Sequence, residues 1–152
     1  ENIFFRIELV PISLFITGCF LLVTKFNNSS KQITLHSAIL VGLFQILALL
    51  PGISRSGITI SVAMILGVDR KLATKFSFFM AIPMLIGAMV LQIPDLVKLD
   101  TQNYIPMIFG FLASAISGYY VVKWLIKLIS QNHFWKFSIY CWILSIVLYI
   151  YK

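Results

Sequence analysis

The sequence predicts an all-α, polytopic integral membrane protein in which transmembrane helices accompany a re-entrant helix pair. Hydrophobic residues make up 60% of the 152 residues and charged residues only 11%, against about 25% charged residues in typical soluble domains. The mean hydropathy of +0.97 agrees with this composition. A chain of this size leaves about a third of its extended-chain surface exposed, and so few polar residues cannot cover that surface in water. We therefore expect a single transmembrane domain over residues 1–152.

The lengths of the apolar runs distinguish spanning helices from shorter ones. Four runs approach or exceed the roughly 20 residues that a membrane-crossing helix needs: Ile7–Thr24, Ala73–Ile93, Tyr104–Ile126 and Phe134–Tyr151. Two others, Ser37–Leu50 and Ile58–Val68, are too short to cross about 30 Å of hydrocarbon, and Pro51-Gly52 ends the first of them. They predict a re-entrant helix pair at about residues 37–68.

Individual residues support the three C-terminal spans. Pro83 predicts a kink in the span 73–93. In the span 104–126, small residues recur at four-residue intervals, a stripe typical of close helix packing: Gly110, Ser114 and Gly118. Aromatic residues near both ends of the last span suit anchoring at the membrane interfaces: Trp135, Trp142, Tyr149 and Tyr151.

The distribution of charge predicts the orientation. Cations gather in the loops 25–36, 69–75 and 123–136, which hold Lys25, Lys31, Arg70, Lys71, Lys75, Lys123, Lys127 and Lys136 with one acid, Asp69. The opposite face has Arg6, Lys98 and Lys152 beside Asp95 and Asp100. The positive-inside rule places the three loops in the cytoplasm, and two full crossings by the short helices would give the same assignment. The net charge of +7 is thus typical of membrane-flanking loops, and no nucleic-acid partner is expected.

The remaining reactive side chains indicate no metal site of this chain's own. Cys19 and Cys141 lie inside apolar runs, which favours small buried hydrophobes over a disulfide. His36 and His133 are isolated, and no Cys/His cluster has metal-ligand spacing.

The polar segment between the two short helices carries the candidate chemistry. It reads PGISRSGIT from Pro51 to Thr59. An arginine is energetically expensive in a membrane and usually faces a cavity, and Arg55 can donate two hydrogen bonds to a phosphate. Hydroxyl donors and glycines that permit close backbone approach surround it: Ser54, Ser56, Thr59, Gly52 and Gly57. The segment predicts an anion site, with a surface connector capped by Ser54 as the alternative.

Residues 42–59, GLFQILALLPGISRSGIT, closely resemble the undecaprenyl-diphosphatase family of the bacitracin-resistance type. The hallmark P-G-x-S-R-S-x-x-T is complete from Pro51 to Thr59, and the stretch 73–83 also resembles that family's next helix. The resemblance covers the whole chain but only the C-terminal part of the family's length. It therefore implies the C-terminal half of an inverted-repeat fold, whose site lies near the membrane midplane.

The resemblance implies a multi-pass hydrolase of the bacterial inner membrane that converts undecaprenyl diphosphate to undecaprenyl phosphate and phosphate. This reaction recycles the lipid carrier for peptidoglycan synthesis and confers bacitracin resistance. The implied partners are a polyprenyl diphosphate lipid and the membrane, and the oligomeric state stays open. On the family pattern, the catalytic residues would be Arg55, Ser54 and Ser56, and the substrate-binding residues Gly52, Gly57, Thr59 and Gln45.

The same resemblance implies a divalent cation, Mg²⁺ or Ca²⁺, held by a Glu-x-x-x-Glu motif. This chain has no acidic pair at that spacing, so we expect the ligands in the N-terminal half of a longer protein and expect this chain alone to be inactive. The sequence leaves open whether Ser54, Ser56 or a water attacks. A transporter or lipid-flipping half that binds an anionic head group without hydrolysis is the alternative from another class, and a purely structural bundle is a third.

Overall fold

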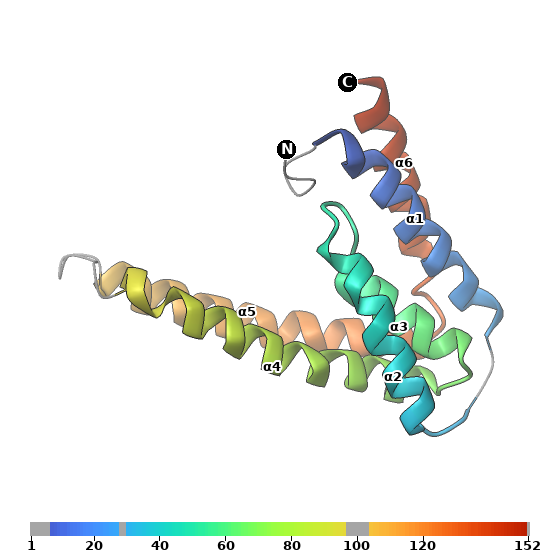
Figure 1. Ribbon diagram of the computed structural model, residues 1–152, viewed down its shortest axis with the longest axis horizontal. Helices are drawn as coiled ribbons and strands as arrows, with labels where there is room; N and C mark the ends of the chain where they lie inside the picture. Colours follow the sequence, from blue (N-terminus) through green and yellow to red (C-terminus); the bar gives the residue numbers. More distant parts are fainter. Residues whose placement is uncertain (1–6, 28–29, 97–103, 152) are drawn as a thin grey trace.

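Among the residues that the structure describes, the regular elements are all helical, as the sequence predicts (Figure 1). The computed structural model describes residues 7–27, 30–96 and 104–151. Its α-helices are α1 (Val10–Val23), α2 (Leu35–Phe44), α3 (Arg55–Ile65), α4 (Arg70–Leu96), α5 (Tyr104–Ser130) and α6 (Lys136–Ile150). Short 3-10 helices are η2 (Ile7–Leu9), η3 (Thr24–Phe26) and η4 (Gln45–Leu49).

Two helices have the length and composition to cross a membrane. They occupy Arg70–Pro94 and Ile105–Ser130, which agrees with two of the four predicted spans, and α4 continues through Pro83. Helices α1 and α6 are shorter, with 14 and 15 residues, although η2 and η3 extend α1 at both ends. Arg6, Lys98, Asp100, Lys152 and the side chain of Asp95, assigned above to the opposite face, lie outside the described residues.

Helices α1 and α6 lie side by side along most of their length (Figure 1). Trp142 Nε1 donates to the Phe15 carbonyl at 3.3 Å, and Ser145 Oγ donates to the Pro11 carbonyl at 2.6 Å. A Cβ on Gly18 would lie 2.4 Å from Trp142 Nε1. A glycine is therefore required here for the two helices to pack closely.

The small-residue stripe of α5 packs differently from the prediction. A Cβ on Gly110 or Gly118 would meet nothing within 4 Å, and Ser114 between them is exposed. The stripe therefore has no packing partner among the described residues, and a close helix–helix contact at a glycine occurs instead between α1 and α6.

Helices α2 and α3 form a hairpin that returns to its starting end. Lys31 N–H donates to the Gly67 carbonyl at 3.1 Å, and Asp69 N–H donates to the Lys31 carbonyl at 3.0 Å. The Lys25 ammonium lies 4.6 Å from the Trp135 ring centroid, which brings the turn between α5 and α6 to the same end. The three cation-rich loops thus share one end of the molecule, as a re-entrant pair requires; the depth of the pair in a bilayer stays a prediction.

Helix α3 lies at the centre of the fold. All eight residues from Gly57 to Met64 are buried, because α3 packs against α1, α2 and α4. Helices α4 and α5 extend away from this centre as a long hairpin (Figure 1), and their apolar side chains are largely exposed. The best-packed part of the chain is therefore the helix whose first residue is Arg55.

Candidate functional site

Helix α3 begins at Arg55 because Ser54 caps it. Ser54 has an extended backbone, and its Oγ accepts the Gly57 N–H at 3.1 Å, which satisfies one of the amides that a helix start leaves unpaired. The sequence alternative of a capped connector is thus correct for Ser54. It does not describe Arg55, whose side chain is half-buried and hydrogen-bonded within the protein.

The Arg55 guanidinium bridges two elements. Nη2 donates to Gln45 Oε1 on η4 at 2.7 Å, and Nη1 donates to the Ser77 carbonyl on α4 at 2.9 Å. Nε is buried and has no hydrogen-bond partner among the described residues. Buried donors are nearly always paired in folded proteins, so this N–H is available to an acceptor that enters the site.

A mostly apolar cavity of about 230 Å³ lies beside Arg55. Its lining residues are Gly42, Gln45, Ile46, Ala48, Leu49, Arg55 and Met84. A pocket with apolar walls and a few convergent polar groups is typical of small-molecule sites. The Arg55 charge and the Gln45 amide supply the polar groups here, so the cavity suits a ligand that combines an anionic group with a hydrocarbon chain.

The tip of the hairpin is fixed against α1. Gly52 has φ +91°, and a Cβ there would lie 2.9 Å from the Val10 carbonyl oxygen. Ser54 N–H donates to Thr17 Oγ1 at 3.2 Å, and a Cβ on Gly57 would lie 3.4 Å from Thr17 Cγ2. Gly52 therefore permits close approach to α1, whereas the space beside Gly57 is limited mainly by the capping Ser54 side chain, 3.0 Å from the added Cβ.

Thr59 faces α4. Its side chain is fully buried, and Oγ1 lies 2.6 Å from Ser77 Oγ and 3.0 Å from the Arg55 carbonyl oxygen. Ser56, in the first turn of α3, is half-buried. The structure therefore brings Arg55 and Gln45 together at the cavity, whereas Thr59 stabilises the α3–α4 contact behind them.

Two residues that hold this site were not singled out from the sequence. Thr17 anchors the tip to α1, and Ser77 contacts both Arg55 and Thr59. Each is a polar residue within a long apolar run, and Thr17 follows Ser13 by one helical turn. Hydroxyls at such positions are a recognisable signal for helix–helix contacts.

The donors around Arg55 do not fit a divalent cation. Mg²⁺ and Ca²⁺ require several oxygen ligands, mostly carboxylates. The cavity is lined by a guanidinium, an amide and apolar side chains, and the described part of the chain has no group of three or more His, Cys, Asp or Glu side chains that could hold a metal.

Comparison with known proteins gives consistent matches. The family model described as "Bacitracin resistance protein BacA" matches residues 1–147. A protein named "Undecaprenyl-diphosphatase" from Methanobrevibacter smithii is 39% identical over 155 residues, which cover 99% of this chain and 56% of that protein. Proteins of the same name from Methanothermobacter thermautotrophicus (39% identity, 90% of this chain, 83% of that protein) and Halothermothrix orenii (32% identity, 98% and 60%) are also similar. The chain thus spans little more than half the length of the first of these relatives.

Proposed function

Because this chain belongs to the bacitracin resistance protein BacA family, we propose that it forms part of a membrane phosphatase acting on undecaprenyl diphosphate. Similar proteins carry the name undecaprenyl-diphosphatase. The products are undecaprenyl phosphate and inorganic phosphate, so the reaction returns the lipid carrier to cell-wall synthesis and counteracts bacitracin. The enzyme acts in the bacterial inner membrane, with the three cation-rich loops in the cytoplasm.

The surroundings of Arg55 support this function most directly. A fixed cation with an unpaired buried donor, Nε–H, lies there beside an apolar cavity. The diphosphate accepts hydrogen bonds from the guanidinium, including Nε–H, and the prenyl chain follows the apolar wall. Guanidinium–phosphate contacts are charge-assisted and can be bidentate. A free anion has no hydrocarbon to pack against the apolar wall, so the cavity favours a lipid-linked diphosphate.

The chemistry assigned to this chain is electrostatic. In the hydrolysis, an oxygen nucleophile adds to the terminal phosphorus, the bond to the bridging oxygen breaks, and undecaprenyl phosphate leaves. Arg55 stabilises the negative charge on the phosphoryl oxygens as that bond breaks. Ser54 Oγ already accepts the Gly57 N–H, so it retains its own proton to donate to a phosphate oxygen.

The base and the cation are proposed to lie elsewhere in the full-length protein. The residues lining the Arg55 cavity include no carboxylate and no imidazole. We propose that a divalent cation, Mg²⁺ or Ca²⁺, is held by carboxylates in the part of the relatives' length that this chain does not span. This chain then supplies the phosphate-binding half of a shared site.

The test is phosphate release from a polyprenyl diphosphate by the full-length protein. Arg55→Ala is expected to lower kcat/KM by about 100-fold or more, as removal of one transition-state donor does. Arg55→Lys keeps the charge but loses the paired N–H donors of the planar guanidinium, so an intermediate rate is expected. Lys75→Ala removes an exposed cation from α4 and is the matched control. Near-equal rates for wild type and Arg55→Ala would refute the role of Arg55.

A further inference from the structure

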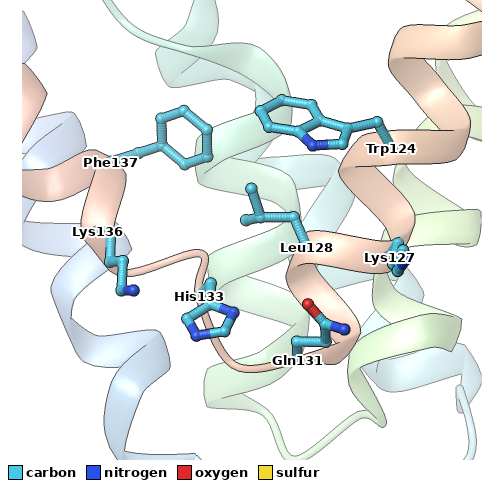
Figure 2. A pocket seen from close by; sticks show the side chains of 7 residues that line it. All are labelled: Trp124, Lys127, Leu128, Gln131, His133, Lys136 and Phe137. Carbon is cyan, nitrogen blue, oxygen red and sulfur yellow. The ribbon is translucent and has the colours of Figure 1, made fainter.

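A second cavity lies far along the chain from the hairpin tip. It has a volume of about 490 Å³ and occupies the turn between α5 and α6. Its lining residues are Trp124, Lys127, Leu128, Gln131, His133, Lys136 and Phe137 (Figure 2). None of them belongs to the candidate phosphatase site, so this cavity needs its own explanation.

The cavity has an apolar side and a polar side. Figure 2 shows the rings of Phe137 and Trp124 on the side away from the turn, with Gln131 and His133 on the turn itself. Trp124 lies six residues before Ser130, the last residue of α5, which places it about 9 Å from that end of the helix at 1.5 Å per residue. In a membrane crossed by α5, which has the length and composition to span one, the apolar side would face the interior and the polar side the head-group region.

Two cations border the cavity from different helices. Lys127 comes from the end of α5 and Lys136 from the first position of α6, and neither ammonium has a hydrogen-bond or ion-pair partner among the described residues. The lining contains no acidic residue. Asp69, the acid of the cation-rich loops, does not line the cavity and accepts the backbone N–H groups of Lys71 and Leu72. The cavity therefore carries uncompensated positive charge.

Lys25, at the same end of the molecule, already has an aromatic partner. Lys25 lies over the Trp135 ring, 4.6 Å from its centroid, so an aromatic face already contacts its ammonium. Trp135 lies between His133 and Lys136 in the chain but is absent from the cavity lining. Lys127 and Lys136 are thus the cations that remain for a ligand at the α5–α6 turn.

We propose that this cavity binds the phosphodiester head group of an anionic membrane phospholipid. The phosphate lies between Lys127 and Lys136, the Gln131 amide donates to it, and the start of an acyl chain packs on Trp124 and Phe137. Basic pockets between membrane helices on the cation-rich face bind lipid head groups by this chemistry. Free phosphate would use only the polar side, which is why the apolar side favours a lipid.

The test measures lipid retention by the full-length protein. The detergent-solubilised protein is incubated with equal amounts of phosphatidylglycerol and phosphatidylcholine, and bound lipid is counted by native mass spectrometry. The wild type is expected to retain phosphatidylglycerol preferentially. Each lysine near a membrane surface contributes about a five-fold factor toward an anionic lipid, so Lys127→Gln with Lys136→Gln is expected to lower that preference about thirty-fold. Lys127→Arg with Lys136→Arg is expected to retain it.

The matched control removes the same charge from the same end. Lys71→Gln with Lys75→Gln alters two exposed cations that do not line the cavity, so it is expected to change the preference less than about two-fold. Trp124→Ala keeps the charge and is expected to lower retention of both lipids. Equal loss in the control pair, or unchanged preference in the Gln pair, would overturn the proposal. Competition by millimolar inorganic phosphate that fully displaces phosphatidylglycerol would also overturn it, because a free anion would then be the ligand.

Discussion

The Gln45–Arg55 contact yields the sharpest prediction for catalysis. Gln45 Oε1 accepts Arg55 Nη2–H at 2.7 Å, and both side chains line the same cavity. A neutral amide orients the guanidinium without cancelling its charge. Gln45→Glu keeps the size and the acceptor but adds a negative charge, so it is expected to compete with the diphosphate for Arg55.

The size of this effect follows from the distance. Two unit charges 2.7 Å apart attract by about 6 kcal/mol at an effective dielectric constant of about 20. The amide already provides a charge-assisted hydrogen bond of about 2 kcal/mol. Arg55 is only half-buried, so solvent screening reduces the difference between the ion-pair energy and the hydrogen-bond energy by about half. About 2 kcal/mol is left, which corresponds to roughly a thirty-fold weaker interaction with substrate.

The assay is the dependence of phosphate release on polyprenyl diphosphate concentration, in the full-length protein. Gln45→Glu is expected to raise KM about thirty-fold, while the midpoint of thermal unfolding stays equal or rises because the new ion pair is internal. Gln32→Glu makes the same chemical change at an exposed position and is the control. An unchanged KM for Gln45→Glu, with the fold intact, would show that the diphosphate does not use Arg55 as placed here.

The remaining predictions concern three glycines, and thermal unfolding of the full-length protein measures each. Gly52→Ala is expected to destabilise by about 1–3 kcal/mol, because φ is +91° and the new Cβ would lie 2.9 Å from the Val10 carbonyl oxygen; phosphatase activity should fall with it. Gly18→Ala is expected to lower stability by about 1–3 kcal/mol, because its Cβ would lie 2.4 Å from Trp142 Nε1. Gly118→Ala meets nothing within 4 Å and is expected to be neutral or stabilising by up to about 1 kcal/mol; destabilisation equal to that of Gly18→Ala would show that the α5 stripe packs against another part of the full-length protein.

The helical architecture was predictable because long apolar runs carry their own signal. The all-α class, the membrane-length helices α4 and α5 and the α2–α3 hairpin follow from composition, run length and the break at Pro51-Gly52. The small-residue stripe on α5 predicted a close helix contact that does not occur among the described residues. Small residues show only that such a contact is possible. The glycine that does make such a contact, Gly18, lies alone in its run.

The site was predictable in its motif but not in its partners. Arg55 is recognisable in the sequence because a charged side chain in an apolar segment is energetically costly and usually has a functional role. Thr17 and Ser77 could not be assigned, because their roles depend on which helices meet, and hydroxyls within apolar helices commonly bond to their own backbone. Thr17 does this as well, with Oγ1 donating to the Ser13 carbonyl at 3.0 Å while it accepts the Ser54 N–H. Only the packing of α3 reveals the second contact.

At the start of α3, the residues that hold the turn in place differ from the residue that faces the cavity. Gly52 faces α1, where an added carbon would lie 2.9 Å from the Val10 carbonyl oxygen and 3.1 Å from Ser13 Cβ. Arg55 points elsewhere, to η4 and α4. One surface of the turn thus fixes its position against α1, and the other presents the guanidinium to the cavity. Substitutions on the α1 side should therefore lower stability and activity together, whereas Gln45→Glu should change substrate affinity without loss of stability. That contrast distinguishes a residue that positions Arg55 from one that shares its ligand.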